Sequence, residues 1–498
     1  MHEIITIQLG HFANFVGTHF WNVQESYFTY DESGDPSPVD HDVHFRAGLG
    51  VGNIETFTPR VLIYDLKGGF GSLRKINQLY QDDDELAGLK DLDINRLWSG
   101  KNETRKTPTV EKNQYQHSLE EGTEPGRPTD DTVRYWSDFN RLYYHPRSSV
   151  QFNEYEHANI LTPFDSFELG SELFESSDKE EDILDRQFRP FAEECDLMQG
   201  LQVLTTIDDG WAGFATRYLS NLRDEYPKCT IWTWALERSA KTTRDRVLSQ
   251  TATSTRALIS MLPLCTTYVP LNVPRPTLRI PSYLKGYDPT STWRTSALIA
   301  SALETCILPC RLKAMSSGKQ SLAEASTLLN VAGNQQISTL HLATLNNEDA
   351  NQGTAKGADT SSLSADAVDL SWGGTEKHIF AAYEVVRGGI ETRHDSTGRP
   401  FNATIGARKS KQYCKLPFPL LSSFPEIYEG ATEGDGTALR LATSLKTSSS
   451  IIEHLKTSQA LVNRIMPSDE RETISNGLGE LTEAYQEGWG SDEDDFDD

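Results

Sequence analysis

Residues 3–22, EIITIQLGHFANFVGTHFWN, decide the fold, because their hydrophobic pattern changes from that of a strand to that of a helix. Residues 4–9 form a short, β-branched, almost wholly apolar run, which is typical of a strand covered on both faces in a parallel sheet. Gly10 ends that run. The next large side chains recur at helical spacing and predict one stripe on one side of a helix, formed by Phe12, Phe15, Val16, His19, Phe20 and Val23.

A strand that turns through a glycine directly into a helix has two interpretations. Such a turn directs free backbone N–H groups and the positive end of the helix dipole at one point, which suits a phosphate group. It is also the ordinary first strand and helix of an α/β domain, and a single glycine does not distinguish the two. The residues of this turn that are candidates to hold a nucleotide are Gly10, His11, Phe12 and Asn14.

The stretch resembles the amino terminus of tubulins, in which an opening strand leads into a GQCGN loop and then a helix with a G-x-x-F/W-W motif. This chain has GHFAN at residues 10–14, followed by Gly17, Phe20 and Trp21. It is more similar still to the Misato family, tubulin-like proteins linked to mitochondrial distribution and inheritance. Members of that family open with QLGH-(Y/F)-(A/S)-NFVG-x-H-(F/W)-WN, and residues 8–22 match this pattern almost residue for residue.

The resemblance covers roughly residues 1–310 and is closest to Misato proteins of the fungal type. It implies an α/β nucleotide-binding fold of the tubulin/FtsZ type with a mostly parallel sheet. A smaller α+β domain and an acidic tail are expected after it. The expected divisions are 1–98 and 133–312 as two tubulin-like segments, 99–132 as a polar insertion, 313–376 as a variable insertion, 377–480 as the C-terminal α+β region and 481–498 as a disordered acidic tail.

A second informative unit, FTPRVLIYDLKGGFGSL, occupies residues 57–73. Its apolar run predicts a strand with Asp65 at the carboxyl end, where ligands collect in open α/β sheets. Asp65 is therefore a candidate to hold a metal ion or a water near a phosphate, or alternatively to cap the next element. Tubulins have a similar run ending in DLEP, whose acidic residues help to hold nucleotide and magnesium.

Lys67 replaces the glutamate of that tubulin motif, as it does in the DLKG version shared by Misato proteins. A lysine at this position is a candidate phosphate contact, but it removes one carboxylate from any magnesium shell. No metal-ligand set is predicted for this chain.

Residues 201–236 predict a β–α–β unit with a right-handed crossover. LQVLTTI forms the first strand and CTIWTWAL the second. The helix between them turns Phe214, Tyr218, Leu219 and Leu222 inward. Tubulins carry their GGGTGSG phosphate loop at this position, followed by a helix whose end resembles residues 223–227 here.

The loop itself departs from the tubulin pattern, because residues 208–213 read DDGWAG. Two carboxylates beside a polyphosphate cost on the order of 1 kcal/mol each even when well solvated. Trp211 also fills space that glycines leave open. This loop is expected to bind GTP poorly unless magnesium intervenes, although Gly210 and Gly213 remain candidate nucleotide contacts.

The acidic residue that completes GTP hydrolysis in tubulins, in a later helix of the N-x-D type, has no counterpart in the sequence. Residues 254–289 are proline-rich instead and precede an apolar helix over residues 295–312. No catalytic residue is predicted, and polymerisation like that of tubulin is not expected.

Composition restricts the partners and the location. The formal net charge of -25 argues against direct nucleic-acid binding, because a nucleic-acid binder needs a basic face. No apolar run approaches the roughly 20 residues that a transmembrane helix needs. The amino terminus carries Glu3 and has neither a basic region nor a cleavage site, so no signal peptide is expected. The protein is expected to stay on the cytosolic side.

Six cysteines are scattered along the chain, and only Cys306 and Cys310 are close in sequence. A zinc site would need two further ligands at a recognisable spacing. The pattern favours buried free thiols in a reducing compartment.

The Misato resemblance alone implies a function: a non-enzymatic protein in mitochondrial partitioning and mitochondrial DNA inheritance. It would act from the cytoplasm or the outer surface of mitochondria, with peripheral membrane association and with tubulin or outer-surface proteins as partners. Two alternatives stay open. One is a GTP-binding switch or weak GTPase with GTP or GDP as cofactor, which Gly10, Asn14 and Asp65 favour. The other is a tubulin-interacting or microtubule-associated protein.

Overall fold

The computed structural model describes residues 3–29, 36–50, 54–74, 110–238, 243–274, 280–313, 316, 318–345, 367–388, 408–429 and 438–486. Its centre is a six-stranded sheet in the order β5-β4-β1-β6-β7-β8, in which every neighbouring pair is parallel. The strands are β1 (Glu3–Leu9), β4 (Val61–Lys67), β5 (Ser149–Glu156), β6 (Met198–Thr206), β7 (Thr230–Glu237) and β8 (Thr267–Asn272). This arrangement confirms the predicted α/β tubulin-like fold.

β1 lies in the middle of this sheet, between β4 and β6, and all seven of its residues are buried. Ile4 belongs to the hydrophobic core on one face of the sheet, whereas Ile5 and Ile7 belong to the core on the other face. The apolar run therefore forms a strand covered on both faces, as predicted.

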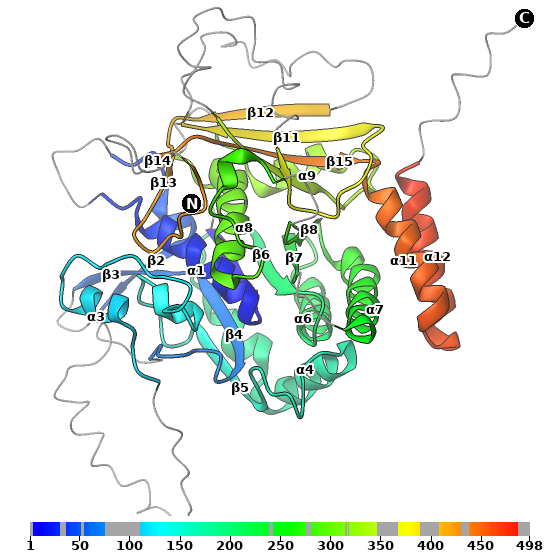
Figure 1. Cartoon of the computed structure of the whole chain (residues 1–498), viewed down its shortest axis with the longest axis horizontal. Coiled ribbons are helices and arrows are strands. Elements are labelled where there is room, and N and C mark those ends of the chain that lie inside the picture. The colour runs from blue at the N-terminus through cyan, green and yellow to red at the C-terminus, as the bar shows by residue number, and fades with distance from the viewer. Residues whose placement is uncertain are drawn as a thin grey trace, which may run out of the picture.

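Helices cover both faces of the sheet. α1 (His11–Glu25) and α8 (Thr292–Ile307) pack together on one face, and α4 (Phe167–Glu181), α6 (Trp211–Glu225) and α7 (Arg244–Met261) lie on the other (Figure 1). The four residues of the α6 helix that were predicted to point inward are all buried.

α1 differs from the prediction of a single buried stripe, because every residue from Phe12 to Gln24 is buried. α8 and the 3-10 turn Trp136–Phe139 cover the side of α1 that the sheet leaves free. Polar residues of α1 consequently need internal partners. The Asn22 side-chain amide donates to the Phe139 carbonyl at 2.8 Å.

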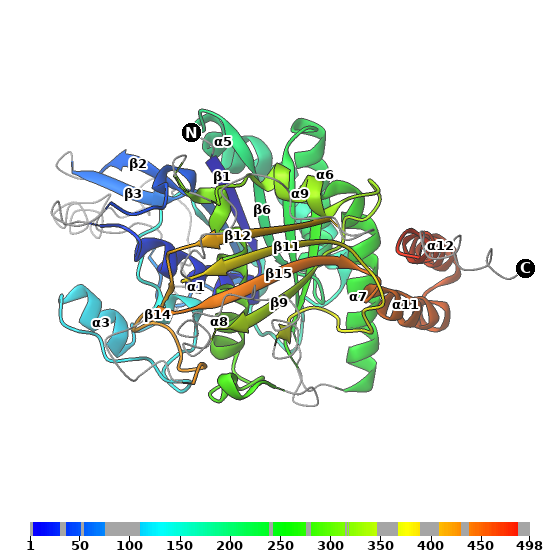
Figure 2. The same cartoon turned by 90° about the horizontal axis from the view of Figure 1, so that it is seen from above.

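A second sheet lies across α8 and α9 (Leu322–Leu329) (Figure 2). Its order is β10-β9-β15-β11-β12, with β11 and β12 parallel and the other pairs antiparallel. The strands are β9 (Thr339–Thr344), β10 (Val368–Asp369), β11 (Ile379–Arg387), β12 (Arg408–Cys414) and β15 (Leu441–Ser448). β9 and β10 fall within residues 313–376, so that range contributes strands to this sheet.

The two C-terminal helices lie at the periphery. α11 (Ile451–Ile465) and α12 (Ser468–Ala484) form a hairpin beside α7, and α12 extends into the range expected as a tail (Figure 1). Residues 487–498, the acidic end of that range, lie outside the described residues. Other short elements are β2 (Phe45–Leu49), β3 (Glu55–Pro59), α3 (Gln114–Glu120), a π-helical turn Ile183–Phe188, α5 (Arg189–Glu193), β13 (Phe418–Pro419) and β14 (Ala438–Leu439). Further 3-10 turns are His41–Val43, Leu262–Leu264, Ser282–Leu284 and Leu308–Arg311.

Two predictions about side chains and membranes can be compared with this fold. All six cysteines are free, as predicted, and four of them are buried. In the described part of the chain, no helix combines the length and the apolar character needed to cross a bilayer.

Three charged residues and a tyrosine join the layers, and we call this group the junction cluster: Tyr27, Glu304, Arg311 and Arg387. Both guanidinium groups donate to the Glu304 carboxylate, and the Tyr27 hydroxyl donates to its Oε1 at 2.9 Å. All three charged side chains are fully buried. Burial opposes the charge of Glu304, but the two arginines dominate and lower its pKa. The cluster ties α8 to β11 of the second sheet.

Candidate functional site

A cavity of about 1080 Å³ lies beyond the carboxyl ends of the central strands. Its lining includes His11 after β1, residues 156–160 at the end of β5, Asp208 after β6 and Arg238 after β7. The strand order reverses beside β1, because the chain extends the sheet first toward β5 and later toward β8. Ligands of open α/β sheets bind outside the carboxyl ends at such a point, so this cavity is the candidate site.

Asp65 lies immediately behind the cavity wall and is fully buried. Its Oδ2 accepts hydrogen bonds from His11 Nδ1 at 3.2 Å, from Asn14 Nδ2 at 3.0 Å and from Trp136 Nε1 at 3.2 Å. Its Oδ1 accepts one from the Leu66 N–H at 2.9 Å. Residues from α1, β4 and the turn after residue 135 thus all converge on one carboxylate.

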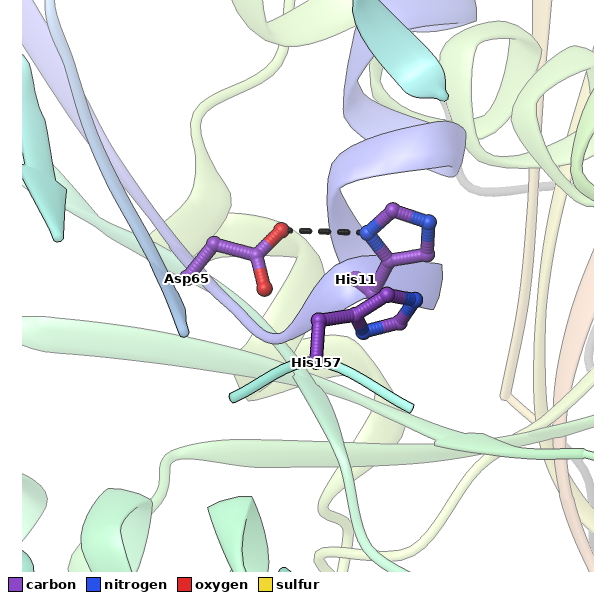
Figure 3. Close-up of side chains that lie close together, drawn as sticks. All are labelled: His11, Asp65 and His157. Carbon is purple, nitrogen blue, oxygen red and sulfur yellow. Dashed lines mark hydrogen bonds and ion pairs between the residues drawn. The ribbon is translucent and has the colours of Figure 1, made fainter. Parts of the chain in front are cut away.

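His157 completes this group, which we call the Asp65 cluster: His11, Asn14, Asp65, Trp136 and His157. The imidazole rings of His11 and His157 are 3.9 Å apart between centroids, with their planes 33° apart. One ligand atom from each of His11, Asp65 and His157 lies within 4.8 Å of the other two (Figure 3). These three side chains are the residues of the site that could hold a metal ion.

Burial and the hydrogen bonds of the cluster determine its charges. Burial opposes ionisation of Asp65, but the hydrogen bond and charge of His11 dominate and lower its pKa. Burial, followed by the charge of His11, lowers the pKa of His157 to about 4. At neutral pH, Asp65 is therefore ionised and His157 is neutral.

The β6–α6 turn supplies its own anion to the start of α6. Asp209 Oδ1 accepts from the Thr206 hydroxyl at 2.7 Å and from the Trp211 N–H at 3.0 Å. Arg238 Nη2 lies 2.9 Å from the other oxygen of Asp209, and its Nε lies 3.5 Å from Asp208. Burial raises the pKa of Asp209 to about 6, against the opposing effect of Arg238. The carboxylate occupies the helix N-terminus that a phosphate would need.

Trp211 packs directly on the β1–α1 turn. A Cβ atom built on Gly10 would lie 2.6 Å from Trp211 Cδ1, and Gly10 has a φ of +97°. The turn requires glycine for both reasons, because L residues rarely adopt that φ and the indole leaves no room for a side chain. The space above the predicted phosphate-binding turn is therefore filled by the indole of Trp211.

Gly210, directly before α6, and Gly213, in its first turn, face the segment that leads into α4. A Cβ atom on Gly210 would lie 2.6 Å from Cε1 of Phe164, and one on Gly213 would lie 1.9 Å from the Phe167 carbonyl oxygen. These glycines let the segment that begins α4 approach the start of α6. Neither of them is among the residues that line the cavity.

The structure separates the other predicted site residues. His11 and Phe12 line the cavity, whereas Asn14 and Asp65 lie behind them. Lys67 is not among the lining residues, but its carbonyl accepts the His157 N–H at 2.8 Å and so positions that histidine.

Sequence reasoning missed His157, Trp136 and Arg238 as members of the site. For His157 a signal existed. It directly follows a strand that pairs in parallel with β4, and carboxyl ends of parallel strands share one edge. Finding it required knowing that residues 149–156 are the neighbour of β4.

Comparisons with known proteins agree with this architecture. A model of the Misato Segment II tubulin-like domain matches residues 2–121, and a model of the Tubulin domain matches residues 125–312. Protein DML1 of Gibberella zeae is 42% identical, with 100% of both chains covered. Protein dml1 of Aspergillus oryzae is 39% identical over 99% of each chain, and Protein DML1 of Yarrowia lipolytica is 28% identical over 100% of each chain.

Proposed function

Because this chain belongs to the Misato/DML1 family of tubulin-like proteins, we propose that it is a non-enzymatic protein that acts in mitochondrial distribution and mitochondrial DNA inheritance. It works from the cytoplasm or the outer surface of mitochondria, through protein partners. The support for the organelle is the resemblance to Misato proteins carried by residues 8–22.

A non-enzymatic role is supported by the occupation of both turns that would hold a nucleotide by side chains of the protein itself. Trp211 fills the space above Gly10, and Asp209 occupies the N-terminus of α6. Asp208 and Asp209 also add negative charge beside any polyphosphate, which Arg238 already neutralises in part. A site arranged in this way does not stabilise the charge that develops on a transferring phosphoryl group.

The experiment that tests the organelle role is depletion of the protein in cells that express it, followed by complementation with the full chain. We expect an unevenly partitioned mitochondrial network and a falling mitochondrial DNA copy number, both restored by complementation. A normal network with a steady copy number after complete depletion would refute the proposal.

A GTP-binding switch is the second candidate, and the cavity is the observation that favours it. Its volume of about 1080 Å³ is ample for a nucleotide, and His11 lines it at the edge of the sheet where nucleotides bind in such folds. The switch would need Trp211 to move, because the indole lies against that turn.

Equilibrium binding of labelled GTP and GDP to the purified chain, with and without magnesium, distinguishes the two candidates. A Trp211→Gly variant tests whether the indole blocks the site, and Asp65→Ala tests the carboxylate. No binding up to millimolar nucleotide by the wild-type chain supports the non-enzymatic role. Saturable micromolar binding that Asp65→Ala abolishes would favour the switch.

A further inference from the structure

We propose that His11, Asp65 and His157 bind one divalent transition-metal ion of the zinc class at the wall of the cavity. The proposed role in mitochondrial distribution does not require this ion, so the inference extends beyond that function. The two can fail independently.

The donor set selects the class of metal. Two imidazoles and one carboxylate suit zinc and its first-row neighbours, whereas magnesium and calcium prefer shells made wholly of oxygen. Zinc sites with three protein ligands leave a further coordination position for water or another ligand. His11 and His157 line the cavity and Asp65 lies behind them, so such a position faces the cavity.

The spacing of the first two ligands already fits coordination. With metal–ligand bonds of about 2.0–2.1 Å, neighbouring ligands of a tetrahedral ion lie about 3.3–3.4 Å apart. His11 Nδ1 and Asp65 Oδ2 are 3.2 Å apart. A metal ion can therefore replace the proton that joins them with little movement of either side chain.

His157 must move a short distance to complete the shell. Its ligand atom lies within 4.8 Å of the other two, and its backbone is held by the hydrogen bond from its N–H to the Lys67 carbonyl. A rotation of the side chain about an anchored backbone brings the imidazole to the ion. Figure 3 shows this ring directly beside the contact between His11 and Asp65.

The surroundings of Asp65 resemble the outer shell that metal sites use. Asn14 and Trp136 both donate to the carboxylate and fix its orientation, as outer-shell partners do for metal ligands. Glu156, Asp208 and Asp209 add negative charge to the cavity lining, which attracts a cation. Arg238 offsets part of this charge through its contacts with the two aspartates, and Arg134 and Arg246 add positive charge to the lining.

The test uses the full chain without an affinity tag, freed of metal with a chelator. Zn²⁺ is titrated in competition with a chromophoric chelator, and Co²⁺ is added separately because its visible absorption reports tetrahedral coordination. We expect one equivalent of Zn²⁺ to bind with submicromolar affinity and Co²⁺ to give a tetrahedral spectrum. Millimolar Mg²⁺ is expected not to compete.

Variants locate the site. His157→Ala and His11→Ala are each expected to weaken Zn²⁺ binding by more than about tenfold, since even outer-shell changes cost about 10–100-fold. His117→Ala is the matched control, because His117 is an exposed histidine of α3 outside the cluster. Circular dichroism establishes that each variant is folded. If His11→Ala fails to fold, His157→Ala decides the question.

Three outcomes would overturn the proposal. One is the absence of stoichiometric Zn²⁺ binding to the wild-type chain. The second is a folded His157→Ala variant that binds Zn²⁺ as tightly as the wild type. The third is displacement of Zn²⁺ by Mg²⁺ at comparable concentration, which would exclude the zinc class.

Discussion

The Asp65 cluster and the junction cluster are each built around a fully buried carboxylate, yet their partners differ in kind. Glu304 is bound by two guanidinium groups that stay charged at every accessible pH. Asp65 is bound by an imidazole, an amide and an indole, and a cavity lies beside it. Fixed cations make the first carboxylate part of the scaffold, whereas exchangeable partners beside a cavity leave the second available to a ligand.

The strongest test of this contrast is Glu304→Ala. It leaves Arg311 and Arg387 buried without their carboxylate, and breaking a buried ion pair in this way costs about 3–5 kcal/mol. Urea unfolding measures the loss. Glu429→Ala is the matched control, because Glu429 forms an exposed pair with Lys285 that water and salt screen, so little loss of stability is expected. Equal losses of unfolding free energy in the two variants would contradict the scaffold role of the junction cluster.

Metal addition is expected to raise stability through the Asp65 cluster and not through the junction cluster. Zn²⁺ at about one hundred times its dissociation constant is expected to raise the free energy of unfolding by about 2.7 kcal/mol. Glu304→Ala should keep this increment and His157→Ala should lose it. Unfolding with Zn²⁺ and with a chelator measures the difference, and an increment that survives in His157→Ala would contradict the assignment.

Asp65→Asn tests how much the hydrogen bonds accepted by the Asp65 carboxylate contribute to the stability of the fold. An amide cannot accept from His11, Asn14 and Trp136 as the carboxylate does, so at least one buried donor loses its partner. The expected loss is about 1–3 kcal/mol, smaller than for Glu304→Ala because the partners left behind are hydrogen-bond donors at the cavity wall rather than two fully buried guanidinium groups. Urea unfolding of both variants under the same conditions gives the ranking, and a larger loss for Asp65→Asn would reverse it.

His19 is a buried histidine outside both clusters, and its lowered pKa predicts a pH dependence of stability that can be compared with theirs. Burial lowers its pKa to about 3, against the opposing hydrogen bond with the Trp293 carbonyl. As the pH falls, the unfolded chain protonates His19 near pH 6.5, whereas the folded chain protonates it only near pH 3. The contribution of His19 to stability is therefore fully present above about pH 6.5 and is lost as the pH falls below that value. Between about pH 8 and pH 5.5 the loss is about 1.4 kcal/mol.

His19→Gln should reduce the dependence of stability on pH in that window by this amount, since glutamine does not titrate. The unfolding free energy measured at several pH values gives the slope for each protein. An unchanged slope would show that His19 is not the group responsible.

The local part of the fold could be predicted from the sequence. The apolar run before Gly10 and the helical spacing after it specify β1 and α1, because both depend on neighbouring residues. The burial of α1 on every side could not be predicted, since α8 and the turn at 136–139 come from distant parts of the chain. The strand β9 was also missed, because it lies in a range whose Ser-, Gly-, Asn- and Ala-rich composition resembles an insertion.

The candidate site was predicted only in part, for the same physical reason. Asp65 was identified because a carboxylate at the end of an apolar strand is visible in the sequence. His157 becomes its neighbour only through the pairing of β4 with β5. The junction cluster was not foreseen, because buried ions and surface ions look alike in a sequence until the packing is known.

The two glycines at the start of α6 restrict what this turn can become. Gly210 and Gly213 lie against residues 164–167, so a shift of the turn toward the geometry of a phosphate loop would collide with that segment. Replacing Trp211 alone would empty space above Gly10 without supplying backbone donors in new positions. Nucleotide binding of the tubulin kind at this turn would therefore need changes in both α6 and the segment that leads into α4, in addition to the loss of the indole.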